Sequence, residues 1–139
     1  MNTAVIGLGS NINPQSNIQK AKELIASKYN ILGQSSFITT KPIGYLHQPN
    51  FINGAILIET DLSLEELKTD LKKMENAMGR RAVDPLQKFG PRKIDLDIVV
   101  WNNTIIDKDF YQRGYLKKMA KELLPDLKYS SNERKRVEK

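Results

Sequence analysis

The chain has 139 residues, which suits one domain with a single hydrophobic core. It has no cysteine, and this excludes disulfides, thiolate metal sites and cysteine nucleophiles. The net charge is +6, but residues 128–139 hold five basic and two acidic residues, so the rest carries only about +3, too little to indicate a nucleic-acid partner.

The first part of the chain predicts a strand, a helix and a second strand. Residues 2–8 are typical of a buried strand that ends at the glycines around Leu8. Ser16 and Gln19 have the spacing of a capping box, and an apolar stripe behind them predicts a helix. A second strand is expected over residues 30–40, followed by a loop that contains Pro and Gly.

The middle of the chain predicts a third strand and a strongly marked helix. Residues 51–60 are expected to form the strand. Ser63 and Glu66 form a capping box at the start of the helix, and Gly79 is placed to end it. The apolar stripe of this helix is expected to contain Leu64, Leu67, Leu71, Met74 and Met78.

The last part predicts a fourth strand over residues 94–101, a turn at Asn102 and Asn103, and a returning segment over 104–106. A third helix is expected over residues 109–124, where Pro125 stops it. The order strand–helix–strand–strand–helix–strand is the βαββαβ pattern of a ferredoxin-like α+β fold with an antiparallel sheet.

Asp95 and Asp97 are the strongest chemical signal. Residues two apart in a strand point the same way, so both carboxylates are expected on one face. The opposite face is expected to hold Ile94, Leu96, Ile98 and Val100. Two neighbouring carboxylates repel unless a cation neutralises them, and magnesium accepts one or two carboxylates together with water and phosphate oxygens. The alternative is a solvated polar face.

Basic residues gather just before this pair, namely Arg80, Arg81, Lys88, Arg92 and Lys93. Arginine binds phosphate oxygens in a bidentate way and keeps its charge. The cluster therefore favours a phosphate-binding role for Arg80 and Arg92, while a solvated loop is preferred for Arg81 and Lys93.

Phe51 and Asn53 are expected on one face of the third strand, opposite the isoleucines at 52, 56 and 58. A ring and an amide suit a flat heterocycle, but a core phenylalanine and an edge asparagine are an alternative. Lys72 and Glu75 share one side of the second helix, where spacing favours an exposed ion pair. His47, the only histidine, is expected to be a surface residue.

Three segments together resemble the 6-hydroxymethyl-7,8-dihydropterin pyrophosphokinase family of the folate pathway. They are Gly7–Asn11 (GLGSN) after the first strand, Gln48–Asn53 (QPNFIN) entering the third strand, and Gly90–Ile98 (GPRKIDLDI) entering the fourth. The resemblance covers about residues 4–127, so we expect one enzyme domain over 1–127. Residues 128–139 are polar and are expected to form a frayed basic tail.

This resemblance implies that magnesium-bound ATP gives its β,γ-diphosphoryl unit to the pterin hydroxymethyl group and that AMP is released. Asp95 and Asp97 correspond to the family's ligands for two magnesium ions. Arg92 corresponds to its phosphate-binding arginine, and Arg80 to an arginine of its mobile loop. Two metals, arginines and a closing loop would supply the positioning and charge neutralisation that phosphoryl-type transfer needs.

The resemblance also implies two sets of binding residues. For the pterin they are Thr40, Pro42, Ile43, Phe51, Asn53 and Tyr115. For ATP they are Lys72, Glu75, Arg80, Lys88, Arg92, Ile98 and Arg113. Phe51 and Tyr115 stand at the two stacking positions, and Asn53 stands at the position of the amide that pairs with the pterin.

The chain departs from the family pattern on the nucleotide side. The family usually carries a Pro-His-aromatic segment before its Arg-Gly-aromatic segment, whereas here residues 106–110 lead almost directly to Arg113. Phe89 replaces the usual loop tryptophan. A non-catalytic pterin- or nucleotide-binding relative is therefore one alternative function, and a ferredoxin-like interaction domain is another. Intact Asp95, Asp97, Arg92, Phe51 and Asn53 argue against the interaction domain.

The expected partners are ATP and a dihydropterin alcohol, without nucleic acid or a membrane. The amino-terminus lacks the pattern of a signal peptide, and no apolar stretch approaches the roughly 18 residues needed to span a bilayer. We therefore expect a cytoplasmic protein, and we expect a monomer.

Overall fold

The computed structural model describes residues 1–42, 47–79, 93–108, 110 and 113–128. The elements in chain order are β1 (Asn2–Ser10), α1 (Pro14–Lys28), β2 (Asn30–Gln34), β3 (Ile38–Thr40), β4 (Phe51–Thr60), α2 (Leu64–Ala77), β5 (Asp95–Trp101), β6 (Thr104–Ile105) and α3 (Gly114–Leu123).

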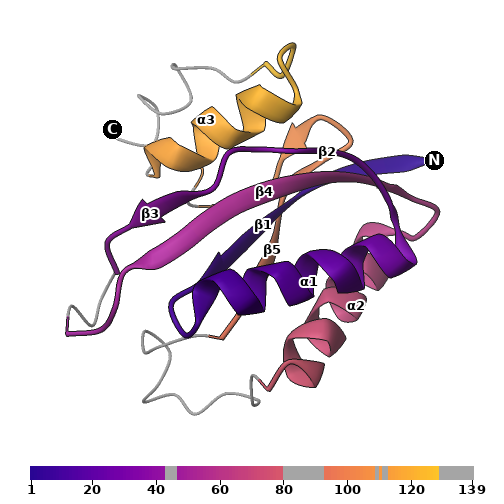
Figure 1. The fold of residues 1–139 in the computed structure, drawn as a ribbon. Helices are drawn as coiled ribbons and strands as arrows, with labels where there is room; N and C mark the ends of the chain where they lie inside the picture. The colour runs from indigo at the N-terminus through magenta and orange to yellow at the C-terminus, as the bar shows by residue number, and fades with distance from the viewer. Residues whose placement is uncertain (43–46, 80–92, 109, 111–112, 129–139) are drawn as a thin grey trace.

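The described strands form one antiparallel sheet with the order β2-β4-β1-β5-β6, and β3 pairs with β4 further along the same edge. α1 and α2 lie on one face of the sheet and α3 lies on the other (Figure 1). This arrangement confirms the predicted ferredoxin-like α+β fold, because the four main strands have the order expected for βαββαβ.

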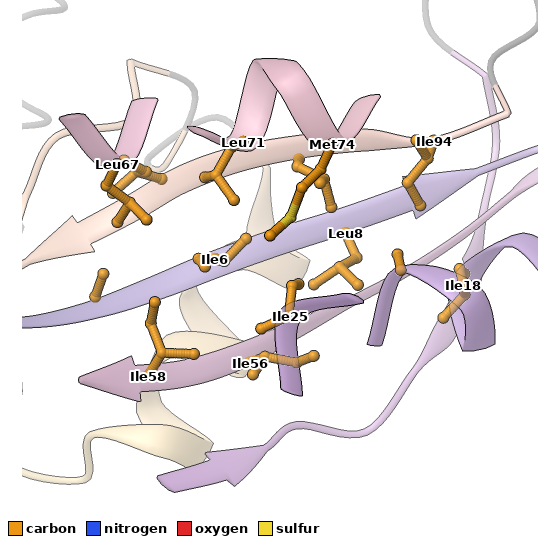
Figure 2. Packing of buried hydrophobic residues seen from close by; sticks show 14 of the residues in the cluster. Ile6, Leu8, Ile18, Ile25, Ile56, Ile58, Leu67, Leu71, Met74 and Ile94 are labelled. Carbon is orange, nitrogen blue, oxygen red and sulfur yellow. The ribbon is translucent and has the colours of Figure 1, made fainter. Parts of the chain in front are cut away.

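The larger hydrophobic core lies between the sheet and the two helices α1 and α2. Figure 2 shows Leu67, Leu71 and Met74 of α2 directed at Ile6 and Leu8 of β1. Ile18 and Ile25 of α1, Ile56 and Ile58 of β4, and Ile94 complete the labelled part of this layer. The predicted apolar stripe of α2 is therefore confirmed, since its members are buried or packed against the cluster.

The start of α2 forms as its sequence predicts. The Ser63 hydroxyl accepts the Glu66 N–H at 3.2 Å, and the Glu66 carboxylate accepts the Ser63 N–H at 2.9 Å. These two bonds satisfy N–H groups that have no partner inside the helix. The helix ends before Gly79, whose φ of +98° lies in the region that glycine adopts readily.

The predicted start of α1 is wrong. The helix begins at Pro14, and its N-cap is Asn13 with a φ of 41° and no side-chain capping bond, in place of a capping box at Ser16 and Gln19. Proline suits the first helical position because its fixed φ is helical and its missing N–H has no helical partner there.

Two predicted strand boundaries also change. β1 continues through Gly7 and Gly9 to Ser10, because both neighbours, β4 and β5, pair with it over this stretch. The strand expected over residues 30–40 divides into β2 and β3 at Ser35. There the Ser35 hydroxyl accepts the N–H of Ala55 at 2.8 Å and replaces a carbonyl of the ladder.

The fourth strand contains a bulge that the alternating pattern did not predict. Ile6 pairs with Ile98 but the preceding Val5 pairs with Val100, so Val99 is an extra residue in β5. As a result Val100 joins Val99 in the cluster beneath α3, and the prediction that Val100 shares a face with Ile98 is wrong.

α3 begins at Gly114, later than the predicted start at residue 109. Phe110 is fully buried in the α3-side cluster, and its N–H donates to the Asp107 carbonyl in a turn. This residue therefore anchors the connection to the core before the helix starts. Asp109 and the two residues at 111–112 lie outside the described residues.

Within the described ranges, none of the helices has the length and apolar character needed to cross a bilayer. The division into residues 1–127 and a tail over 128–139 stays a prediction, since the described residues end at Lys128.

Candidate active site

A cleft of about 920 Å³ opens around the first half of β5. Its described lining comes from β1, β3, β4, β5, α2, the segment after β6 and the start of α3. The lining includes the described members of both predicted binding sets except Pro42. Pro42 is buried and follows the lining residue Lys41 in the sequence. The cleft therefore collects residues that are distant in the sequence.

The register of three strands creates two rows of residues on the α3 face. Asn53, Gly9 and Asp95 are directly opposite one another on β4, β1 and β5. Ala55, Gly7 and Asp97 form the next row in the same way. Because residues opposite one another point to the same face, the amide and the two carboxylates share a floor of glycine and alanine.

The glycines of this floor allow close approach. An added Cβ at Gly9 would lie only 2.6 Å from Oδ1 of Asn53 and 3.9 Å from Cδ2 of Phe51. At Gly7 the nearest atom would be Cγ2 of Val99 at 3.3 Å. Glycine at position 9 therefore leaves the space in which the Asn53 amide lies over β1.

Asp95 and Asp97 both line the cleft, and the predicted placement on one face is confirmed. Asp95 is half-buried and Asp97 is exposed. Within the described part of the chain, no group of three or more His, Cys, Asp or Glu side chains could hold a metal ion. Two carboxylates alone suit an ion that takes its remaining ligands from water and phosphate, as magnesium does.

The pterin-side prediction is brought together around Asn53. The Asn53 amide donates a hydrogen bond to the Thr40 hydroxyl on β3, and Phe51 stands beside it on β4. On the other side of the cleft, Tyr115 lines the wall at the start of α3, and its hydroxyl accepts a bond from Arg113 at 3.4 Å.

The part of the cleft away from the pterin-side residues is formed by α2 and the outer edge of β5. Lys72 is exposed, whereas Glu75 is only 4% exposed and accepts the Leu96 N–H at 2.7 Å. The exposed Lys72–Glu75 ion pair favoured by the spacing is therefore wrong, because the glutamate turns in to β5. Ile98 lines this side as well, although its side chain belongs to the main core.

Several predicted residues lie outside the described residues. They are Ile43, Arg80, Arg81, Lys88, Phe89 and Arg92. Their roles stay predictions. His47 is exposed and is not part of the cleft lining that the structure describes.

The sequence interpretation missed three kinds of lining residue. Gly7 and Gly9 were treated as the end of a strand, although they form the floor. Lys68, one helical turn before Lys72, also lines the cleft, and the i to i+4 spacing could have indicated this. Lys41 carried no signal beyond its position next to Thr40.

The segment after β6 also reaches the cleft. The N–H groups of Ile106 and Asp107 both donate to the carbonyl of Val99, at 3.0 and 3.3 Å. The bulge at Val99 therefore holds this segment, and Lys108 follows it in the lining.

Comparison with known proteins places the chain in one group. Residues 5–125 match the family model described as 7,8-dihydro-6-hydroxymethylpterin-pyrophosphokinase. Proteins named 2-amino-4-hydroxy-6-hydroxymethyldihydropteridine pyrophosphokinase from Haemophilus influenzae and Aquifex aeolicus are 38% and 36% identical, over 78% and 76% of this chain. A folate synthesis bifunctional protein from Arabidopsis thaliana is 36% identical over 76% of this chain and 22% of its own length.

The matched region spans 68% and 65% of the Haemophilus and Aquifex proteins, so it covers about two thirds of those relatives. The match extends over β1 to α3 and therefore includes every element that lines the cleft. The predicted family is confirmed, and with it the reaction class of pyrophosphoryl transfer in folate biosynthesis at the level of the family. The chain belongs to the 7,8-dihydro-6-hydroxymethylpterin-pyrophosphokinase family.

Proposed function

We propose that this chain transfers the β,γ-diphosphoryl group of magnesium-bound ATP to the hydroxymethyl group of 6-hydroxymethyl-7,8-dihydropterin. The hydroxymethyl oxygen bonds to the β-phosphorus, the bond from that phosphorus to the α,β-bridging oxygen breaks, AMP leaves, and the hydroxyl proton passes to solvent. The observation that carries the proposal is the row of Asn53, Gly9 and Asp95, which puts an amide and a carboxylate on either side of one glycine in the same cleft.

The pterin binds on the α3 face in this proposal. Phe51 and Tyr115 supply aromatic surface for a flat ring, and both line the cleft. Asn53 pairs with the ring edge, since an amide offers both a donor and an acceptor. Thr40 holds that amide through its hydroxyl, and Pro42 and Ile43 follow it in the sequence.

The phosphates bind along Asp95 and Asp97. These two carboxylates would hold two magnesium ions, and the bound metal would neutralise phosphate charge and orient the transferred group. Arg80, Lys88 and Arg92 add positive charge from the basic segment that precedes β5 in the sequence, and Arg113 adds it from the start of α3. Phosphoryl-type transfer depends mainly on such positioning, so no nucleophilic side chain is required.

ATP occupies the side bounded by α2, in this proposal, with Lys72, Glu75 and Ile98 as its neighbours. The segment between Asp107 and Arg113 is short, so fewer contacts to the nucleotide are expected than in relatives with the longer segment. The expected cost is about 1–3 kcal/mol, or roughly 5- to 150-fold in ATP affinity. The cytoplasmic location and the monomeric state stay predictions.

The test is product analysis with ATP, magnesium and the dihydropterin. AMP and the pterin diphosphate should form in equal amounts, and Asp95→Asn and Asp97→Asn should each slow the reaction by roughly a hundredfold to a thousandfold. Glu65→Gln, an exposed change on α2, serves as the control. Pterin binding without AMP at high ATP and magnesium would support the non-catalytic alternative instead.

A further inference from the structure

Glu75 is a buried carboxylate whose position in the fold is unusual. It lies on α2, a helix that otherwise buries apolar residues such as Leu71 and Met74 against the sheet. Only 4% of its surface is exposed. Burying an ionisable side chain costs free energy unless it gains strong hydrogen bonds, so this residue needs a structural partner.

One partner of this carboxylate is a backbone group in the strand that carries both aspartates. The Leu96 N–H donates to Oε2 of Glu75 at 2.7 Å, and Leu96 lies between Asp95 and Asp97. A hydrogen bond from a backbone N–H to a carboxylate is shorter and stronger than one to a neutral acceptor. Glu75 therefore contacts the backbone between the two cleft carboxylates.

This contact lies on the outer side of β5. β1 pairs with one side of the strand, while β6 pairs only with Val100 and Trp101. In the described part of the chain, the outer side near Leu96 has no neighbouring strand. An N–H on such an edge would otherwise be free to bond to water, and the strand would be held from one side only.

We infer that Glu75 is a positioning residue, which fixes the backbone at Leu96 and thereby the relative placement of Asp95 and Asp97 for the magnesium-bound phosphates. The carboxylate occupies the position that a neighbouring strand would take. This role rests on the proposed function of the two aspartates, and it differs from the direct ATP contact that the family resemblance implies for Glu75. Loss of a residue that orients a metal ligand typically weakens metal affinity by about 10- to 100-fold.

The experiment compares Glu75→Met with Glu75→Gln. Methionine has a similar length and suits the apolar surroundings, but it offers the Leu96 N–H no strong acceptor, whereas glutamine keeps an oxygen acceptor. Glu66→Ala is the matched control, because it weakens the capping box of the same helix away from β5. The measurements are amide hydrogen exchange at Leu96, binding of Mn²⁺ with a non-hydrolysable ATP analogue, and the separate KM for ATP and kcat.

The expected result is faster exchange at Leu96 in Glu75→Met, with Mn²⁺ binding weakened about 10- to 100-fold and kcat lowered, and substantial recovery of all three in Glu75→Gln. Glu66→Ala should lower stability and leave Leu96 exchange and Mn²⁺ binding unchanged. In the unmodified chain, the Leu96 N–H should exchange as slowly as N–H groups bonded within β1. Fast exchange there would overturn the inference even if Glu75→Met does not fold.

A higher KM for ATP with unchanged Leu96 exchange and unchanged Mn²⁺ binding would also overturn it and would assign Glu75 to direct nucleotide contact. The exchange measurement requires no turnover. Absence of AMP formation by the unmodified chain would therefore reject the proposed function while the contact between Glu75 and β5 is judged separately.

Discussion

The sheet face covered by α1 and α2 differs sharply from the face covered by α3. The first carries a continuous layer of buried apolar residues along β1, β4 and β5. The second has a smaller cluster around Phe110 and Met119 at one end, and glycines, an amide and two carboxylates at the other. The same three strands thus supply packing on one face and candidate binding groups on the other.

This difference indicates how stability and function are divided. Free energy from burial is concentrated where helices cover the sheet, so substitutions there should alter unfolding more than binding. On the open part of the α3 face, few side chains are packed, so substitutions should alter ligand affinity more than stability. Each of the following predictions tests one side of this comparison.

The largest effect on stability is expected from Leu67→Ala in the closed face. Leu67 is fully buried and does not line the cleft. Removing it should lower the free energy of unfolding by about 2–5 kcal/mol, measured by denaturant titration. Leu32→Ala is the control, since Leu32 is 48% exposed and should change stability by less than about 0.5 kcal/mol. Equal effects of the two substitutions would contradict the comparison.

Gly9→Ala should have the next largest effect, and it should act mainly on the pterin. The new Cβ would lie 2.6 Å from Oδ1 of Asn53, so the amide must move. We expect the free energy of pterin binding to weaken by about 1–3 kcal/mol, which calorimetric titration should record as an affinity reduced roughly 5- to 150-fold. Gly7→Ala should lose less, because its Cβ meets a Val99 methyl at 3.3 Å. An unchanged pterin affinity in Gly9→Ala would contradict the assignment of Asn53 to pterin binding.

Thr40→Val should weaken pterin binding more modestly. Valine has nearly the same shape as threonine but cannot accept the hydrogen bond from the Asn53 amide. The expected loss is about 1 kcal/mol, or roughly fivefold in affinity, while Thr40→Ser keeps the hydroxyl and should remain close to the unmodified chain. If valine and serine behave alike, the hydroxyl does not orient Asn53.

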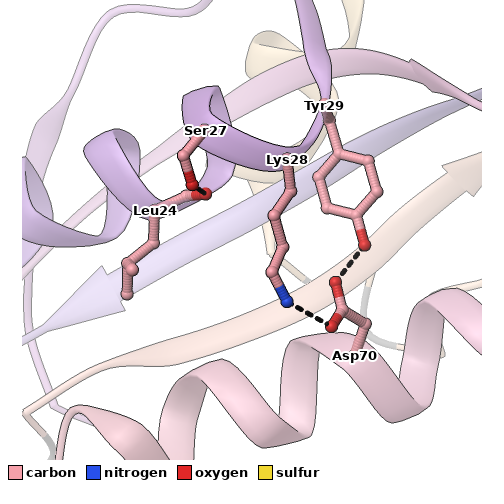
Figure 3. A network of polar contacts seen from close by, with 5 residues as sticks. All are labelled: Leu24, Ser27, Lys28, Tyr29 and Asp70. Carbon is pink, nitrogen blue, oxygen red and sulfur yellow. Dashed lines mark hydrogen bonds and ion pairs between the residues drawn. The ribbon is translucent and has the colours of Figure 1, made fainter.

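The smallest effect is expected at the rim of the closed face, where Asp70 of α2 bonds to Lys28 and Tyr29 at the end of α1 (Figure 3). Burial alone would raise the pKa of Asp70, but the hydrogen bonds from Lys28 and Tyr29 hold this pKa below its ordinary value of 3.8. The ionised Asp70 carboxylate therefore stabilises the fold when the pH is above 3.8. This contribution is lost as the pH falls through the folded-state pKa.

Asp70→Asn should accordingly cost less than about 1 kcal/mol at pH 7, since Lys28 is half exposed and surface pairs contribute little. The difference from the unmodified chain should shrink as the pH is lowered below 3.8. Denaturant titrations at pH 7 and at pH 3 measure both quantities, with pterin affinity at pH 7 as the control. A difference that grows on acidification would contradict this account of the network.

The sequence alone determined the features that depend on local spacing. Alternation along β4 correctly placed Phe51 and Asn53 on one face, and it did the same for Asp95 and Asp97 before the bulge in β5. The capping box of α2 was predicted because all its groups lie within four consecutive residues. The quoted motifs also indicated the family, which the comparisons confirm.

The tertiary structure alone decided which groups face one another across strands and helices. Gly7 and Gly9 belong to the strand because β4 and β5 both pair with them, and the bulge at Val99 turns Val100 to the other face. Glu75 is buried because its carboxylate accepts the Leu96 N–H on the outer edge of β5, where the described chain has no other strand. Such partners lie about 20 residues or more apart in the sequence, and local periodicity depends only on nearby residues, so it cannot predict them.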